Sequence, residues 1–168
     1  MPHSLIIGKT GSGKTTLAKK LAAEMRKKKV PILVLDPSPG ASSWDADYIT
    51  DNPEIFLQTI MSSTHCAFFV DESGDMIGRY GKEKNMLATR TRHLGHSGFF
   101  IVQDIKGLDR TIREQCRDLY TFKIGRKRSF EMAEDFIDDN LKQACELELG
   151  ECFIKIGNDP AYKFNVFT

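Results

Sequence analysis

The sequence predicts an α/β fold with a mainly parallel central sheet, flanked by helices and completed by a C-terminal antiparallel hairpin. Short, continuous apolar runs recur along the chain, as in strands that are covered on both faces of a parallel sheet. Segments with the apolar spacing of a helix separate them, and two alternating segments close the chain. The 168 residues are enough for one domain, which we expect to span residues 1–168.

The first strands and the first helix are marked by apolar residues. Four runs predict the parallel strands: Leu5–Ile7, Ile32–Leu35, Ala67–Val70 and Phe99–Val102. Leu17, Leu21 and Met25 recur at helical spacing after the first run. The basic residues that follow, Arg26–Lys29, complement the negative end of a helix, so we expect no binding role for them.

The later elements follow from periodicity and from turn residues. A helix is expected over Glu83–Leu94, stopped by Gly95. Tyr120, Phe122 and Ile124 alternate with polar residues, as in a strand nearer the edge of the sheet. The segments 152–156 and 162–166 alternate on either side of the turn residues 157–160, which predicts a hairpin.

Bulk composition narrows the class of protein. The 24 basic and 23 acidic residues give a net charge of +1, so any contact with DNA has to be local or has to arise on assembly. The four cysteines show no C-x-x-C spacing, as expected of reduced thiols in the cytosol. No leader or membrane span is recognisable, and we expect no insertion into a membrane.

A phosphate-binding motif directly follows the first strand. The segment Gly8–Thr15 reads G-x-x-x-x-G-K-T, and an amphipathic helix begins at once, which is the context that a P-loop requires. Backbone N–H groups of such a loop surround the phosphates of ATP. Lys14 is expected to reach the β- and γ-phosphates, and the Thr15 hydroxyl to ligate Mg²⁺. The expected nucleotide-binding residues are Gly8, Lys9, Thr10, Gly11, Ser12, Gly13, Lys14, Thr15 and Thr16.

Two adjacent carboxylates end the third apolar run. Strand alternation points Asp71 and Glu72 in different directions, so Asp71 can hold Mg²⁺ while Glu72 polarises the attacking water. Gln103 ends the next run, at the carboxyl edge where open α/β sheets bind ligands, and its amide can sense the γ-phosphate or orient the water. These residues predict hydrolysis of ATP as well as binding.

One arginine of the predicted helix faces away from its apolar stripe. At about 100° per residue, Arg92 lies roughly 140° from Leu87, and Arg90 about 60° away on the other flank. An outward arginine near a nucleotide edge can enter the site of a neighbouring subunit and stabilise the charge of the transition state. We assign this catalytic role to Arg92, with Arg90 as the alternative.

Other basic residues and a pair of histidines have less specific patterns. Arg110, Arg113 and Arg117 share one side of a short helix that Asp109 can cap, which suits a DNA or subunit contact or a plain solvated face. Residues 126–128 form a basic run that we expect in a loop, with the same two interpretations. His93 and His96 are three apart, but Gly95 intervenes, so a metal site is not expected there.

The combined motifs resemble the FtsK/HerA superfamily of P-loop ATPases with a RecA-like fold. The resemblance extends from the P-loop to about Ile124 and includes Asp36-Pro37, residues 90–98, Gln103, residues 111–113 and residues 120–123. Within the superfamily the chain most resembles the packaging ATPases of tailless, membrane-containing DNA viruses. The resemblance also matches Asp71 and Glu72 to Walker B, Gln103 to the sensor and Arg92 to the trans-acting arginine.

This resemblance implies a Mg-dependent ATPase that drives viral double-stranded DNA into a preformed capsid. It implies a homo-oligomeric ring, a pentamer or a hexamer, with capsid vertex proteins as partners, located in the host cytoplasm or at the packaging vertex of the virion. The membrane segments or added DNA-binding domain of the larger cellular translocases are not recognisable in this sequence.

Several alternatives stay open at this stage. Filamentous-phage assembly ATPases share the arginine-histidine-glycine stretch and the later glutamine, but usually have a membrane segment. Nucleoside or nucleotide kinases also place Asp-Glu after a strand, but those that do so are expected to carry a C-x-x-C zinc element. A GTPase lacks support because no N-K-x-D motif occurs. The presence of Glu72 argues against a binding module without enzymatic activity.

Overall fold

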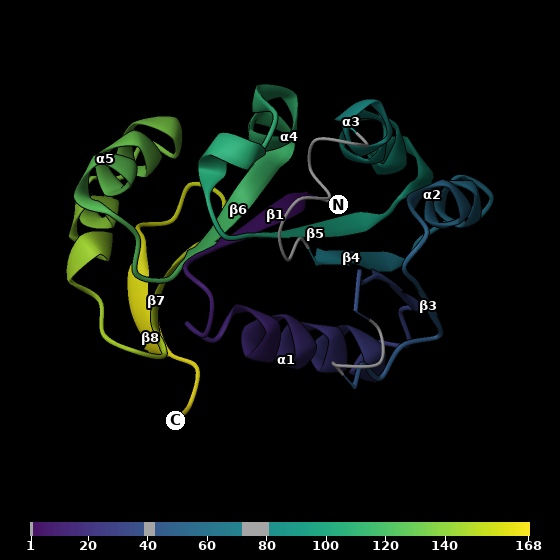
Figure 1. The fold of residues 1–168 in the computed structure, drawn as a ribbon, viewed down its shortest axis with the longest axis horizontal. Helices are drawn as coiled ribbons and strands as arrows, with labels where there is room; N and C mark the ends of the chain where they lie inside the picture. Colours follow the sequence, from purple (N-terminus) through teal and green to yellow (C-terminus); the bar gives the residue numbers. More distant parts are fainter. Residues whose placement is uncertain (1, 39–42, 72–80) are drawn as a thin grey trace.

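The protein is described here by a computed structural model covering residues 2–38, 43–71 and 81–168, with the side chains of residues 81–85 left out. One eight-stranded sheet runs through it in the order β3-β2-β4-β5-β1-β6-β7-β8 (Figure 1). The strands are β1 (His3–Ile7), β2 (Ile32–Leu35), β3 (Tyr48–Thr50), β4 (Ala67–Asp71), β5 (Ser97–Val102), β6 (Cys116–Thr121), β7 (Glu151–Lys155) and β8 (Tyr162–Asn165).

Strand direction is uniform from β3 to β6 and then alternates over β7 and β8. All pairs from β3 to β6 are parallel, whereas β6 pairs with β7 and β7 with β8 in the antiparallel sense. The expected parallel sheet with a C-terminal antiparallel hairpin is therefore confirmed. β5 lies between β1 and β4, so the ends of these three strands are neighbours at the carboxyl edge of the sheet.

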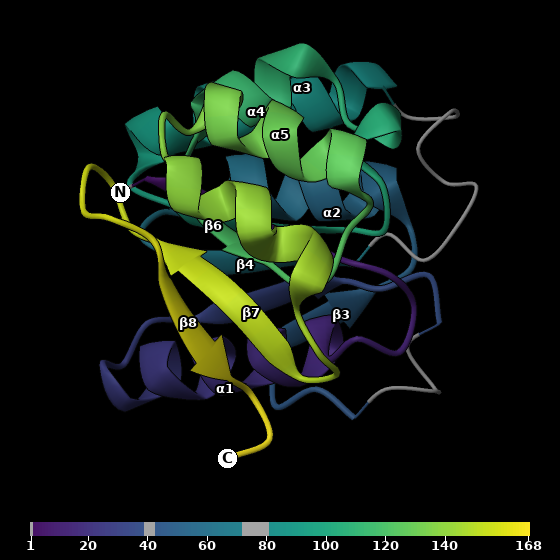
Figure 2. The same cartoon turned by 90° about the vertical axis from the view of Figure 1, so that its left-hand side faces the viewer.

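Helices cover both faces of the sheet. Helix α1 lies on one face, while α2 to α5 lie on the other (Figures 1 and 2). The helices are α1 (Lys14–Lys27), α2 (Pro53–Met61), α3 (Gly81–Arg90), α4 (Arg110–Gln115) and α5 (Arg126–Asp135), with 3₁₀ segments η2 (Thr91–Leu94), η3 (Ile105–Gly107) and η4 (Asp139–Glu146).

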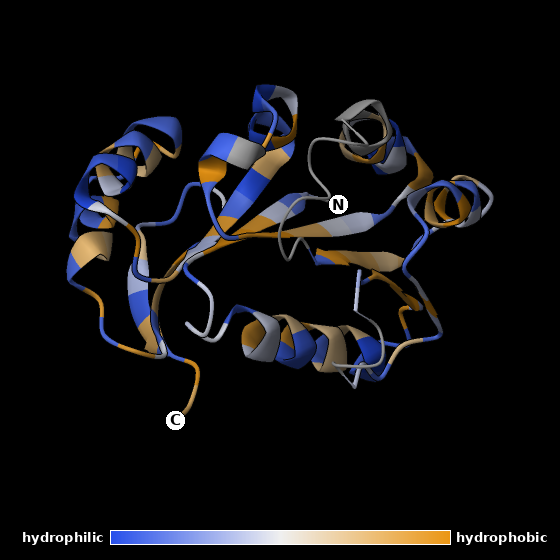
Figure 3. Ribbon diagram, viewed as in Figure 1, coloured by the Kyte–Doolittle hydropathy of each residue, from blue (hydrophilic) through white to orange (hydrophobic). Residues whose placement is uncertain are grey.

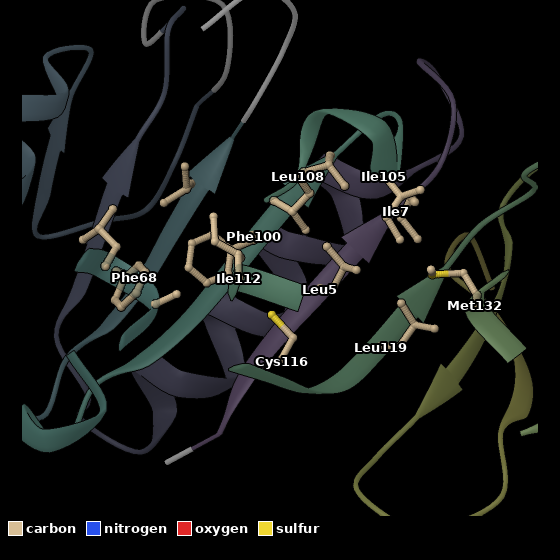
Figure 4. Packing of buried hydrophobic residues seen from close by; sticks show 14 of the residues in the cluster. Leu5, Ile7, Phe68, Phe100, Ile105, Leu108, Ile112, Cys116, Leu119 and Met132 are labelled. Carbon is tan, nitrogen blue, oxygen red and sulfur yellow. The ribbon is translucent and has the colours of Figure 1, made fainter. Parts of the chain in front are cut away.

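Strand alternation divides the core into two clusters, one on each face. Leu5 and Ile7 of β1 pack toward the α2–α5 side, whereas Ile6 between them packs with Leu17 of α1. Figure 3 shows apolar residues concentrated in the strands and polar ones on the outer sides of the helices, and Figure 4 shows Ile112 of α4 among the side chains of the larger cluster. None of the helices within the described ranges has the length and apolar character needed to cross a membrane.

Three local expectations are corrected. The helix expected over Glu83–Leu94 ends at Arg90 and continues as the 3₁₀ segment η2, although Gly95 does stop it with φ 75°. The Thr91 hydroxyl donates to the Leu87 carbonyl, a bond one turn back that bends helices. The strand expected from the alternation of Tyr120, Phe122 and Ile124 is β6, which starts earlier, at Cys116, and ends at Thr121. The basic run 126–128 forms the first turn of α5 and is not a loop.

Candidate active site

The P-loop connects the end of β1 to the start of α1. Gly11 has φ 77° and Gly13 φ 109°, left-handed values that residues with a side chain rarely adopt. The Gly8 N–H donates to the Val102 carbonyl of β5, and the Ser12 N–H to the Lys9 carbonyl, at 3.2 Å each. The loop is thus fixed at both ends, and it leads into the N-terminus of a fourteen-residue helix, where backbone N–H groups attract anions.

An aromatic ring beneath the loop explains two of its glycines. A Cβ atom on Gly8 would lie 2.6 Å from Phe122 Cβ, and one on Gly13 would lie 3.2 Å from Phe122 Cε1. Phe122 is fully buried just beyond β6, and its N–H donates to the Ile7 carbonyl at 2.8 Å. Sequence reasoning treated Phe122 only as a strand residue, because its alternation pattern does not show which loop it supports.

The lysine and the threonine of the motif converge with the carboxylate of β4. Lys14 is buried and its Nζ donates to the Lys9 carbonyl at 2.7 Å. The Thr15 hydroxyl lies 3.4 Å from Asp71 Oδ2. Burial lowers the pKa of Lys14, and the negative charge of Asp71 partly opposes this shift. The partly desolvated ammonium group of Lys14 would be stabilised by the negative charge of a bound phosphate.

Asp71 is close to a second carboxylate that sequence reasoning did not assign to the site. Burial raises the pKa of Asp71, the negative charge of Asp36 raises it further, and Lys14 and Thr15 oppose the shift. Asp36 follows β2, the neighbour of β4, and is 2% exposed. Its Oδ2 accepts a hydrogen bond from Trp44 Nε1 at 3.1 Å. The sequence showed Asp36 only as part of a resemblance, since no spacing rule relates it to Asp71.

The residues of the P-loop and Asp71 fit a nucleoside triphosphate with Mg²⁺. Among the described residues, the buried hydroxyl of Ser12 has no hydrogen-bond partner, so a polar group of the loop is left for a ligand. Within the part of the chain that the structure describes, apart from Gly11 and its chain neighbours, no atom lies within 4 Å of a Cβ built on Gly11, which leaves space for a ligand at the turn of the loop. A cation at Lys14 and oxygen ligands at Thr15 and Asp71 complement phosphate and Mg²⁺ respectively. Lys9, Thr10 and Thr16 are less buried and line the outside of the loop.

Of the two residues expected to act on the attacking water, Gln103 is among the described residues and Glu72 is not. Gln103 directly follows β5 and is exposed, and the strand order places it between the P-loop and Asp71 at the carboxyl edge. The position expected for Gln103 is thus met, although no hydrogen bond of its amide indicates its role. Glu72 lies outside the described residues, so its assignment as the general base stays a prediction.

Arg92 lies at the amino edge of the sheet, opposite the edge that carries the P-loop, and its expected role in a neighbouring subunit's site stays a prediction. It belongs to η2, which precedes the first residue of β5, and it lines a hollow of about 470 Å³ with Pro2, Gln115 and Arg117. Its Nη1 donates to Gln115 Oε1 at 3.1 Å. Since β1 separates Pro2 from the P-loop, the two edges are roughly 17 Å apart at about 3.3 Å per residue.

The remaining basic residues are largely engaged within the chain. Arg110 pairs with Glu114 at 2.6 Å and Arg113 with Asp135 at 3.1 Å, while Arg117 lies on β6 and not on the short helix. The expected cap is confirmed, since Asp109 Oδ1 accepts from the Thr111 N–H. His96 is buried and bonded to the Ile60 carbonyl and the Cys66 N–H, whereas His93 is exposed, so the two rings do not form a pair.

Known proteins share the fold of this chain and the sequence of its N-terminal segment. A family model described as the central domain of the helicase HerA matches residues 1–39, which include the P-loop. The genome packaging NTPase B204 from Sulfolobus turreted icosahedral virus 2, in a structure with sulfate, has a TM-score of 0.77 at 13% identity, covering 98% of this chain and 96% of that one. The same protein has been solved with AMPPCP at the same TM-score and identity.

Two further solved structures have other biological settings. The pCW3 conjugation coupling protein TcpA, with ATPgS, has a TM-score of 0.72 at 17% identity, covering 98% of this chain and 59% of that one. VirB4 of Thermoanaerobacter pseudethanolicus has a TM-score of 0.69 at 8% identity, covering 97% and 88%. The chain therefore has the fold of these solved structures, and its first 39 residues, which contain the P-loop, are similar to the central domain of the helicase HerA.

Proposed function

We propose that this FtsK/HerA-type chain is an ATP-hydrolysing motor that translocates viral double-stranded DNA into a preformed capsid. The observation that carries the ATPase part is the convergence of Lys14, Thr15 and Asp71 at the glycine-rich loop, one strand away from Gln103. The packaging part is supported by the likeness to a viral genome packaging NTPase, which extends over nearly the whole of both chains.

The residues of the loop suggest how the chain holds ATP. The N–H groups of the P-loop and of the first turn of α1 bind the phosphates, and Lys14 compensates the charge that develops on them during transfer. Thr15 and Asp71 would hold Mg²⁺, which neutralises phosphate charge when bound. Glu72 polarises the attacking water and Gln103 orients it, so the γ-phosphoryl group passes to water and leaves ADP and phosphate.

The place of Arg92 points to a site shared between subunits. At roughly 17 Å from its own P-loop across β1, its guanidinium cannot reach the phosphates that its own chain binds. The proposal requires a head-to-tail ring in which the amino edge of one sheet faces the carboxyl edge of the next, so that Arg92 enters the neighbouring site. We propose a homo-oligomeric ring, a pentamer or a hexamer, that acts with capsid vertex proteins at the packaging vertex.

Steady-state ATP hydrolysis, measured across a protein-concentration series with and without double-stranded DNA, tests the function. A DNA motor with shared sites gives a specific activity that rises with concentration and rises further with DNA. Activity that is independent of DNA but rises with a protein substrate would support the assembly or secretion alternative. Turnover that requires a nucleoside or nucleotide acceptor would support a kinase and refute the motor.

Mixing two inactive variants tests the shared site directly. Lys14→Ala removes the P-loop lysine and Arg92→Ala the arginine, so each variant alone should lose turnover. In a 1:1 mixture about a quarter of the interfaces join an intact P-loop to an intact arginine, because each heterologous interface takes one residue from each neighbour. Recovery of activity on mixing supports the shared site. If the mixture stays inactive although the subunits exchange, Arg92 does not act across the interface. Arg90→Ala, mixed with Lys14→Ala in the same way, tests the alternative arginine, since Arg90 is also exposed.

A further inference from the structure

An exposed aromatic side chain lies directly against the P-loop. Phe167 follows β8, and its ring reaches the loop so closely that a Cβ on Gly13 would lie 3.4 Å from its Cζ atom. Its side chain is nevertheless 56% exposed. Figure 1 shows the C-terminal segment leaving β8 near the end of α1 that follows the P-loop. A large apolar surface thus stays open to solvent beside the phosphate-binding loop.

The backbone around Phe167 fixes the position of the ring. The Val166 N–H donates to the Gly150 carbonyl at 2.8 Å, and the Phe167 N–H donates to Asn165 Oδ1 at 2.9 Å. A Cβ on Gly150 would lie 2.3 Å from Phe167 Cδ2, so the absence of a side chain there lets the ring lie on the backbone. The ring is therefore supported from Gly150 and Gly13 and open on the rest of its surface.

A contact between α1 and the C-terminal segment fixes the position of this segment beside the P-loop. Lys20 Nζ donates to the Val166 carbonyl, which ties the segment to the second turn of α1. Thr16, one turn earlier, is exposed. Lys14 is buried whereas Thr16 and Phe167 are exposed, so a triphosphate held at the start of α1 has open space for its ribose and base on the side of Phe167.

We infer that Phe167 is the platform on which the nucleobase of the bound nucleotide stacks. This rests on the proposed binding of ATP and adds the part of the site that recognises the base. Stacking of a base on an aromatic ring contributes strongly to affinity and tolerates different bases, because every base has a π face. Phe167 therefore favours nucleotides over inorganic polyphosphate and discriminates little between ATP and GTP.

Competition binding with ATP, GTP and inorganic tripolyphosphate tests the inference on the full chain. Phe167→Ala should lower the affinities for ATP and for GTP by about tenfold each, while the affinity for tripolyphosphate stays unchanged. Phe167→Trp should keep the nucleotide affinity, and Phe167→Leu, which still fills the space between the two glycines, should lose it. The matched control is Phe130→Ala, because Phe130 is 41% exposed on α5 and interacts there with Arg126 and Lys142.

Two results would overturn the platform. The first is an ATP affinity that stays at the wild-type value in both Phe167→Ala and Phe167→Leu. The second is an equal loss for both ligands, which would mean that Phe167 only shapes the loop. Failure of the proposed function has a different signature, since wild-type protein would then bind neither ATP nor tripolyphosphate, or Lys14→Ala would bind both as well as wild type does.

Discussion

Burial of His3 makes the stability of the protein depend on pH. The ring is fully buried at the start of β1, where Nδ1 accepts from the Gly98 N–H at 2.9 Å and Nε2 lies 3.0 Å from the Ala88 carbonyl. Because Nδ1 accepts, Nε2 carries the proton and donates to Ala88. Burial lowers the pKa of His3 from 6.5 to about 4, and the charges of Arg92 and His96 add to the shift.

The sign and size of the effect follow from proton linkage. The unfolded chain binds a proton at His3 below pH 6.5, whereas the folded chain does so only near pH 4. The contribution to stability is therefore present above pH 6.5 and is lost as the pH falls from 6.5 toward 4. The difference between pKa values of 6.5 and about 4 corresponds to ~3 kcal/mol in total, of which ~2 kcal/mol is lost by pH 5.

Urea unfolding at pH 7.5 and pH 5.0 measures this loss. His3→Asn has no titrating ring but keeps an acceptor for the Gly98 N–H. Its free energy of unfolding should be lower than that of wild type at pH 7.5. Between pH 7.5 and pH 5.0 this free energy should fall by ~2 kcal/mol less than in wild type. The matched control is His93→Asn, which replaces an exposed histidine and should follow wild type. An equal loss in wild type and His3→Asn would refute the reasoning.

Since Ala88 and Thr91 both contact His3, the same protonation should loosen the turn that carries Arg92.

Three further predictions concern the site itself. Gly8→Ala should lower the free energy of unfolding by about 1–3 kcal/mol, measured in urea, because its Cβ would lie 2.6 Å from Phe122 Cβ, an atom next to the backbone. Asp71→Asn should raise the urea midpoint, since burial and Asp36 disfavour the charged carboxylate, but it should abolish Mg-dependent turnover in a phosphate-release assay. Trp44 is the only tryptophan and bonds to Asp36, so its fluorescence should change when Mg²⁺ and ATP are added together, and Asp36→Asn should reduce this change.

The sequence alone determined the fold class and the phosphate-binding half of the site. Continuous apolar runs require a sheet that is covered on both faces, and Gly8–Thr15 combines left-handed backbone, a cation and a hydroxyl within one short segment. Such local patterns can be read directly, because the residues that act together are neighbours in the chain. The hairpin at the end of the chain was predictable for the same reason.

Only the tertiary structure decided which distant residues join this local motif. Phe122 supports the P-loop from just beyond β6, Phe167 borders it from beyond β8, and Asp36 approaches Asp71 because β2 pairs with β4. The position of Arg92 also depended on the structure, because helical periodicity shows which face of a helix a residue occupies but not at which edge of the sheet the helix ends. Contacts between strands are set by the order of the sheet, which spacing along a single chain does not encode.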